Sequence, residues 1–202
     1  MFVTFEGIDL CGKSTQAKLL FDFLKKKKEK VIIIREPGGT RISEKIRRIL
    51  LDKSNNNMFY ITEFLLFSAS RHQLTEEIIK PHLKKGYYVI SDRYYDSSTA
   101  YQGYGGKIDL EIISRINKIA SGGLVPDLSF LIDISYDENI KRRELINKTH
   151  DRIEQKQINY YKKVISGYRT IAKQNSRFRI INGKKSIADI HEIITNIIKT
   201  EK

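Results

Sequence analysis

The chain has 202 residues, of which 40% are hydrophobic and 30% charged, with a formal net charge of +13. This length can bury a hydrophobic core, and without an apolar run of roughly 20 residues or a signal-peptide pattern we expect no membrane-spanning or secreted protein. Cys11 is the only cysteine, so an internal disulfide is excluded and a cytoplasmic location is expected.

Short apolar strands alternate with helices along the chain. Strands are predicted at residues 2–6, 31–35, 87–91, 128–134 and 177–181. Helices are predicted at residues 13–27, 42–50, 58–83 and 187–198, and others fill the gaps. This alternation predicts an α/β fold with a five-stranded parallel sheet flanked by helices, in a single domain over residues 1–202. In such sheets ligands bind beyond the carboxyl ends of the strands.

The segment after the first strand matches the GxxxxGK[ST] motif of a P-loop. Its backbone N–H groups would cradle phosphate oxygens, Lys13 would reach the terminal phosphates and the Ser14 hydroxyl would ligate Mg²⁺. A glycine-rich turn is the alternative, but a position between a strand and a helix favours a nucleoside triphosphate site. We therefore predict an ATP site formed by Gly7, Ile8, Asp9, Leu10, Cys11, Gly12, Lys13, Ser14 and Thr15.

Polar residues also follow the second and third strands. Glu36-Pro37 begins a Pro-Gly-Gly turn, which is a weak signal alone. Asp92 can organise Mg²⁺ and its water, and Arg93 can clamp a phosphate through its planar fork. A surface ion pair between Asp92 and Arg93 is the alternative.

Two helices carry side chains suited to a planar base. Ser98, Tyr101 and Gln102 share one face of a helix that Asp96 or Ser97 could cap. In the long helix before them, Phe64, Phe67 and Arg71 also share a face, although taken alone both phenylalanines could belong to the core. That helix is apolar on more than one side, which predicts burial in the core or against a second subunit.

Six motifs in order carry a resemblance to a known family: FEGID..GKST, REPGGT, FSASR, SDRYYDSSTAYQG, LVPDL and DRIE. Together they resemble thymidylate kinase (dTMP kinase) of the bacterial type, from about Phe2 to about Lys173. The resemblance implies a P-loop nucleoside-monophosphate kinase fold and a homodimer. It also implies Mg²⁺-dependent transfer of the ATP γ-phosphate to dTMP, giving dTDP for dTTP synthesis.

The resemblance also implies roles for the dTMP site. Phe67 would stack on thymine, and Arg71 and Gln102 would read its polar edge. Ser98 would lie near the base, and Tyr101 would crowd the sugar 2′ position and favour deoxyribose. The full predicted dTMP site is Asp9, Glu36, Pro37, Arg47, Phe67, Arg71, Arg93, Ser98, Tyr101 and Gln102.

The phosphate and metal roles follow from the same resemblance. Arg47 and Arg93 would hold the dTMP phosphate, and Asp9 would contact the sugar or a magnesium-bound water. Mg²⁺ would be held by Ser14, Asp92 and Glu36, partly through water. The predicted catalytic residues are Lys13, Asp9, Arg93, Arg152, Arg142 and Arg143.

A basic stretch at about 141–154 is predicted to be a mobile lid rather than only a solvated helix face. Cations over the migrating phosphoryl group speed its transfer. Members of the eukaryotic type place an arginine at the position of Leu10, and bacterial members place it in the lid. Arg142, Arg143 or Arg152 would supply it here, with Arg152 the first choice.

The chain departs from the family pattern at Leu10-Cys11, where most bacterial members have glycine and then a small residue. Leucine resists a positive φ, and its bulk would crowd the γ-phosphate region. Cys11 lies beside a cationic loop and a helix N-terminus, which predicts a lowered pKa and reactivity toward alkylating agents. The alternative is an inert thiol.

Three rival functions remain open at this point. One is a kinase of another nucleotide or nucleoside, against which Phe67, Arg71, Tyr101 and Gln102 argue. The positive charge would also suit a nucleic-acid-stimulated ATPase, but lysine clusters such as 25–28 fall on expected helix surfaces. The third is a non-catalytic nucleotide-binding module. We expect dTMP and ATP as partners, and neither nucleic acid nor a membrane.

Overall fold

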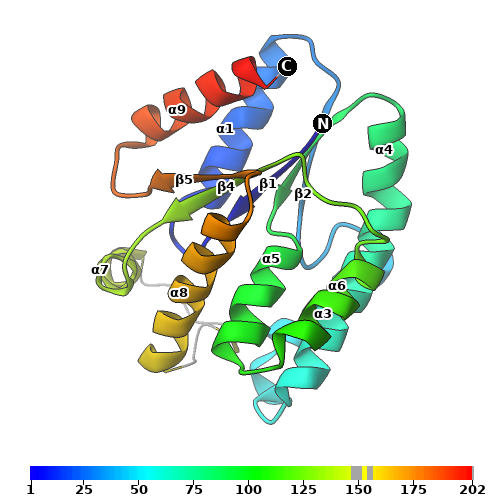
Figure 1. Ribbon diagram of the computed structural model, residues 1–202, viewed down its shortest axis with the longest axis vertical. Coiled ribbons are helices and arrows are strands. Elements are labelled where there is room, and N and C mark those ends of the chain that lie inside the picture. Colours follow the sequence, from blue (N-terminus) through cyan, green and yellow to red (C-terminus); the bar gives the residue numbers. More distant parts are fainter. Residues whose placement is uncertain (147–151, 154–156, 202) are drawn as a thin grey trace.

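The computed structural model describes residues 1–146, 152–153 and 157–201 (Figure 1). Five strands form one parallel sheet in the order β2-β3-β1-β4-β5. They are β1 Phe2–Glu6, β2 Val31–Arg35, β3 Tyr88–Asp92, β4 Leu128–Asp133 and β5 Phe178–Asn182. The predicted fold class is confirmed, and each strand lies within a residue of its predicted bounds.

Helices connect the strands. The α-helices are α1 Lys13–Lys26, α2 Arg41–Leu51, α3 Tyr60–Leu74, α4 Lys80–Lys84, α5 Tyr95–Ser98, α6 Leu110–Ala120, α7 Tyr136–Ile146, α8 Ile158–Gln174 and α9 Ile187–Thr200. Shorter turns are η1 Lys53–Asn55 and the π-helical η2 Thr75–Ile79 and η3 Thr99–Gly105. Among the described residues, none of these helices has both the length and the hydrophobicity needed to cross a bilayer.

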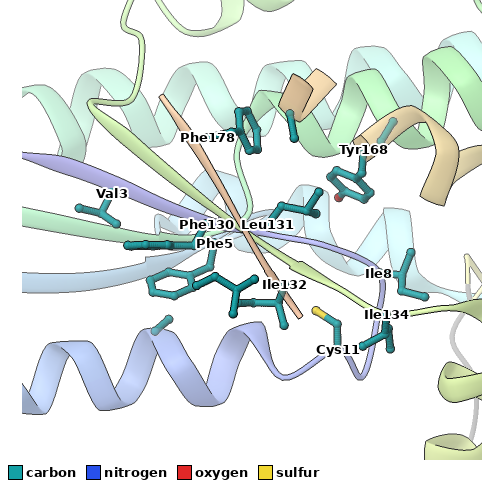
Figure 2. Close-up of a cluster of buried hydrophobic side chains, with 14 of the residues drawn as sticks. Val3, Phe5, Ile8, Cys11, Phe130, Leu131, Ile132, Ile134, Tyr168 and Phe178 are labelled. Atoms are coloured by element: carbon teal, nitrogen blue, oxygen red, sulfur yellow. The ribbon is translucent and has the colours of Figure 1, made fainter. Parts of the chain in front are cut away.

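The sheet is covered on both faces, as continuous apolar strands require. Helices α1 and α9 lie on one face, and α5 and α8 lie on the other (Figure 1). Every residue of β1 is buried, and its Val3 and Phe5 pack with Phe130 and Ile132 of β4 in the main core (Figure 2). Burying such side chains contributes about 1.5–3 kcal/mol each, which makes the centre of the sheet a firm base for the loops beyond it.

The long helical region expected at 58–83 is confirmed as an unbroken helical run from Tyr60 to Lys84, in which the π-helical η2 lies between α3 and α4. One local prediction is wrong. Asp96 and Ser97 do not cap a helix; they lie buried in the first turn of α5, which Tyr94 precedes. The Asp96 carboxylate instead pairs with Arg177 at 2.8 Å.

The sheet register brings the three candidate loops to one edge. Phe5 of β1 pairs with Asp92 of β3, and Arg35 of β2 pairs with the same Asp92. The segments that begin at Gly7, Arg93 and Glu36 therefore leave the sheet side by side. Lysines 25–28, at the end of α1, are exposed as expected.

Candidate active site

The loop between β1 and α1 has positive φ angles at three positions, Gly7, Leu10 and Gly12. Gly7 has φ +136°, and a Cβ there would lie 2.7 Å from the carbonyl oxygen of Ile132, so only glycine fits. Gly12 has φ +102° and leads directly into α1. Leu10 adopts a left-handed φ of 62° despite its side chain. The leucine at position 10 therefore does not prevent the positive φ that it was expected to resist.

Asp9 brings two cations together at this loop. Its Oδ1 lies 2.6 Å from Arg93 Nη2 and 3.7 Å from Lys13 Nζ. Burial alone would raise the pKa of Asp9, but Arg93 and Lys13 lower that pKa well below its usual range. A carboxylate that stays ionised in this position orients both cations at the mouth of the loop.

The oxygen atoms expected to hold Mg²⁺ lie at the same edge. Ser14 Oγ donates to Asp92 Oδ2 at 2.5 Å. Asp92 Oδ1 and Glu36 Oε1 are buried with no hydrogen-bond partner among the described residues. Unpaired carboxylate oxygens are suitable donors for a hard cation or its waters. In the described ranges, no group of three or more His, Cys, Asp or Glu residues is placed so that it could hold a metal ion by itself.

One cavity joins this edge to the predicted acceptor residues. All of the predicted dTMP-binding side chains line it, together with Lys13, Ser14 and Asp92. The remaining lining residues were not predicted from the sequence: Arg35, Leu51, Tyr94, Ser97 and Ile153. The π-helical turn η3 presents Tyr101 and Gln102 to this cavity, and π turns are frequent at functional sites.

Arg71 is fixed in the wall of the cavity by side chains from distant parts of the chain. Its Nε donates to Glu36 Oε2 at 2.8 Å, and its two other nitrogens donate to Asn117 Oδ1 and Ser98 Oγ. Burial raises the pKa of Glu36 to about 7, although Arg71 lowers it. Asn117 is a site residue that the sequence did not indicate, because it lies on α6, outside every motif.

Arg93 occupies a strained position at the centre of the site. Its φ is 75°, and its Nη1 donates to the Gly7 carbonyl at 2.8 Å and to Tyr168 Oη at 3.0 Å. Non-glycine residues held in left-handed conformations cluster at functional sites. Beneath it, Glu6 accepts hydrogen bonds from the Tyr94 N–H and Ser97 Oγ, and burial followed by the charge of Asp96 raises the pKa of Glu6 to about 8.

The three candidate lid arginines do not converge on one point. Arg142 donates to the carbonyls of Leu10 and Cys11, at 3.1 and 3.2 Å. Arg143 donates to Tyr161 Oη at 3.2 Å.

Arg152 lies toward the acceptor side of the cavity. Its Nε donates to the Leu50 carbonyl at 2.9 Å, and its Nη2 lies 2.6 Å from Glu63 Oε2. Its neighbour Ile153 lines the cavity. The rest of the expected lid after α7, including Asp151 and Glu154, lies outside the described residues.

The prediction of a lowered pKa for Cys11 is wrong. Its side chain is 1% exposed and lies between the P-loop and Ile132 and Ile134 (Figure 2). Burial raises the pKa of this thiol, and the nearby Lys13 only partly offsets the effect. Cys11 is therefore part of the core rather than a reactive thiol.

Comparison with known proteins gives one consistent result. A family profile described as thymidylate kinase matches residues 5–194. Among curated proteins, the chain is 47% identical over 199 residues to the thymidylate kinase of a Sulfurihydrogenibium species, covering 98% of this chain and 96% of that protein. It is also 47% identical to that of Thermosipho africanus, covering 98% of each. Among solved structures, the thymidylate kinase of Ehrlichia chaffeensis superposes with a TM-score of 0.79 at 33% identity, covering 98% of each chain.

Proposed function

The chain belongs to the thymidylate kinase family, and from that premise we propose how its residues share the work of phosphoryl transfer. The protein transfers the γ-phosphate of ATP to dTMP and so produces dTDP for dTTP synthesis. The observation that best supports the division of roles is the single cavity lined by Lys13 of the P-loop and by Phe67, Arg71 and Gln102.

The P-loop binds ATP. Its N–H groups and the N-terminus of α1 attract the phosphates, and Lys13 neutralises charge on the terminal ones. Lys13 is buried beside Asp9, so its ammonium group acts where water screens charge weakly. Ser14, Asp92 and Glu36 would hold Mg²⁺, partly through water, and the ion would supply positive charge to the phosphate oxygens.

The cavity binds dTMP. Phe67 stacks on thymine while Arg71 and Gln102 read its edge, and Tyr101 meets the sugar. Arg47 and Arg93 hold the dTMP phosphate. Because a phosphate monoester is already ionised at neutral pH, the reaction needs no strong general base among the protein residues. Catalysis then consists of positioning and charge neutralisation.

A lid at about 141–154 supplies a cation to the transferred group, and Arg152 is the first candidate. Its present partner, Glu63, lies beside the cavity, where Oε1 of Glu63 also accepts from Gln102 at 2.8 Å. Replacing Arg152 by alanine is expected to lower kcat far more than it weakens dTMP binding. An unchanged kcat would remove Arg152 from the mechanism.

A homodimer is the second part of the proposal, supported by apolar side chains left exposed on α3 and next to it. Phe59, Ile61 and Leu65 are 82%, 54% and 49% exposed, and Ile49 lies on the adjoining α2. Sedimentation at micromolar protein is expected to show a dimer that Leu65→Glu converts to a monomer. A wild-type protein that sediments only as a monomer would contradict this. We place the enzyme in the cytoplasm.

The first experiment is a coupled ADP-release assay with ATP and Mg²⁺. The acceptors are dTMP, dUMP, dCMP, AMP, GMP and thymidine. ADP release with dTMP far above the others supports the roles given to Phe67, Arg71 and Gln102. A preference for another acceptor would overturn those roles, and DNA-stimulated hydrolysis without an acceptor would favour the rival ATPase.

A further inference from the structure

The carbonyl groups of the P-loop are all engaged. Each main-chain carbonyl from Gly7 to Gly12 accepts a hydrogen bond from a protein donor. At the two ends of the loop these donors are Arg93 on Gly7 and the N–H of Gln16 on Gly12. Carbonyl oxygens that are held by protein donors are kept from repelling an anion bound at the loop N–H groups.

Two side chains of α7 hold the middle of the loop. Asn139 Nδ2 donates to the Asp9 carbonyl at 2.5 Å. Arg142, one helical turn further on, donates to the carbonyls of Leu10 and Cys11. Residues three apart on a helix share a face, so α7 fixes three consecutive P-loop carbonyls from one side.

The residue between these contacts is the one that resists the loop conformation. Leu10 has φ 62°, a region in which leucine is disfavoured because its Cβ approaches the following carbonyl oxygen. A disfavoured backbone conformation persists only where surrounding contacts impose it. Asn139 holds the carbonyl of Asp9, which precedes the Leu10 nitrogen, and Arg142 holds the carbonyl of Leu10 itself. These two hydrogen bonds fix the peptide groups on both sides of the Leu10 Cα and so impose its positive φ.

Asn139 makes one side-chain hydrogen bond among the described residues, the bond to the Asp9 carbonyl. Its side chain is 0% exposed, and its Oδ1 has no hydrogen-bond partner among the described residues. Burying an unsatisfied amide oxygen opposes folding, which offsets the gain from the single bond to Asp9. The geometry therefore favours a role in the site over a role in the core.

We propose that Asn139 is a positioning residue for ATP, which holds the P-loop around Leu10 in the shape that binds phosphate. The inference rests on the proposed ATP site. It predicts that losing the Asn139 amide weakens nucleotide binding while dTMP binding is retained, because Phe67, Arg71 and Gln102, which bind the base, lie on α3 and η3 rather than on the P-loop.

The test compares Asn139→Ala and Asn139→Asp with the wild type. Calorimetric titration with MgADP, which needs no turnover, is expected to show a dissociation constant raised about five- to twentyfold in Asn139→Ala. Asn139→Asp, which keeps the size but places a carboxylate against the Asp9 carbonyl, is expected to lose at least as much. KM for ATP rises in parallel, and KM for dTMP stays within about twofold.

Combining Asn139→Ala with Leu10→Gly separates a positioning role of Asn139 from a purely structural one, because only a positioning role depends on the residue at position 10. Glycine adopts φ 62° without a steric penalty, so Asn139→Ala is expected to cost less nucleotide affinity in the Leu10→Gly background. The matched control is Asn175→Ala, which also removes an amide that donates to a main-chain carbonyl, that of Ile171. Asn175 lies just before β5, at the edge of the sheet opposite to the P-loop. It is expected to leave MgADP affinity unchanged.

Two results would overturn the proposal. One is MgADP affinity of Asn139→Ala within twofold of the wild type, and the other is an equal loss with leucine or glycine at position 10. Failure of the proposed function looks different, because a wild type that binds MgADP but releases no ADP with dTMP leaves the binding comparison intact.

Discussion

The donor loop and the acceptor cavity are built in different ways. The donor loop is one continuous stretch, from Gly7 to Thr15, which is expected to meet phosphate through its backbone N–H groups and whose carbonyls are held by side chains from other elements. The acceptor wall is assembled from side chains far apart in sequence, such as Glu36, Arg71 and Asn117. In the loop, function can change with little effect on folding. In the wall, one substitution changes both function and folding stability, because the side chains that face the ligand also form buried ion pairs and hydrogen bonds with one another.

The largest effect is expected at the donor loop, from Lys13→Ala. Removing this cation should lower kcat by about 10³-fold or more, because charge on the transferred group is then left without its nearest protein partner. Thermal stability should change little. Lys18→Ala, on the exposed face of the same helix, is the control and should retain wild-type kcat. A Lys13→Ala variant with near-normal kcat would break the comparison at its strongest point.

The next largest effect is expected in the acceptor wall, from Arg71→Ala. KM for dTMP should rise about 10²-fold, and the variant should also lose about 3–5 kcal/mol of unfolding free energy, because Glu36 is left buried without its cation. Urea unfolding and ADP-release kinetics measure the two quantities.

The loss of stability in Arg71→Ala should be smaller at pH 5.5 than at pH 8. Burial raises the pKa of Glu36 to about 7 even with Arg71 present, so without Arg71 acid neutralises the carboxyl more readily. Arg115→Ala, an exposed arginine paired with Glu111 on α6, should change neither quantity. If Arg71→Ala lost dTMP binding but kept the stability of the wild type, function and folding would be as separable in the wall as in the loop.

A smaller effect separates two phenylalanines one turn apart on α3. Phe67 lines the cavity, while Phe64 is 0% exposed in the core. Phe67→Ala should raise KM for dTMP about tenfold, the value of one base–aromatic contact, with a modest loss of stability. Phe64→Ala should lose about 3–5 kcal/mol of stability and bind dTMP normally when folded. If Phe67→Ala and Phe64→Ala raised KM for dTMP equally, the proposal that Phe67 stacks on the base would be wrong.

The sequence predicts the strands and the donor loop well because both depend on local pattern. Apolar runs such as Val31–Arg35 indicate the strands, and the spacing of Gly7, Gly12 and Lys13 indicates the loop between β1 and α1. The residues that line the cavity were predicted because the family motifs contain them, and their roles toward dTMP stay a prediction. Spacing alone could not separate Phe67 from Phe64.

The residues that support the site were missed for a physical reason. Asn117 and Asn139 lie on helices outside the motifs, and only the tertiary fold brings them to Arg71 and the P-loop. Cys11 was misjudged because its sequence neighbours are cationic, whereas its neighbours in space are apolar core residues. Burial of this kind depends on contacts across the sheet that no local pattern contains.

The smallest expected effect concerns Glu6, which lies where the loop and the wall meet. Burial, then Asp96, raises its pKa to about 8, so the folded state holds a proton that the unfolded state releases near pH 4.5. Its contribution to stability is therefore present below pH 4.5 and is lost as the pH rises toward 8. Glu6→Gln cannot ionise, so the stability difference, variant minus wild type, should increase between pH 5.5 and 8.5 by a few kcal/mol at most.

Urea unfolding of the two proteins across this pH range tests the expectation. The exposed Glu111→Gln on α6 should give a difference that does not depend on pH. A constant offset for Glu6→Gln would mean that Glu6 stays ionised beneath Arg93, held by the Ser97 hydroxyl and the Tyr94 N–H. The junction would then be stabilised by charge, as the wall is. A difference that grows with pH would instead mean that Glu6 is protonated and uncharged in the folded protein. The nearest ionised groups of the site would then be Asp9 and Arg93.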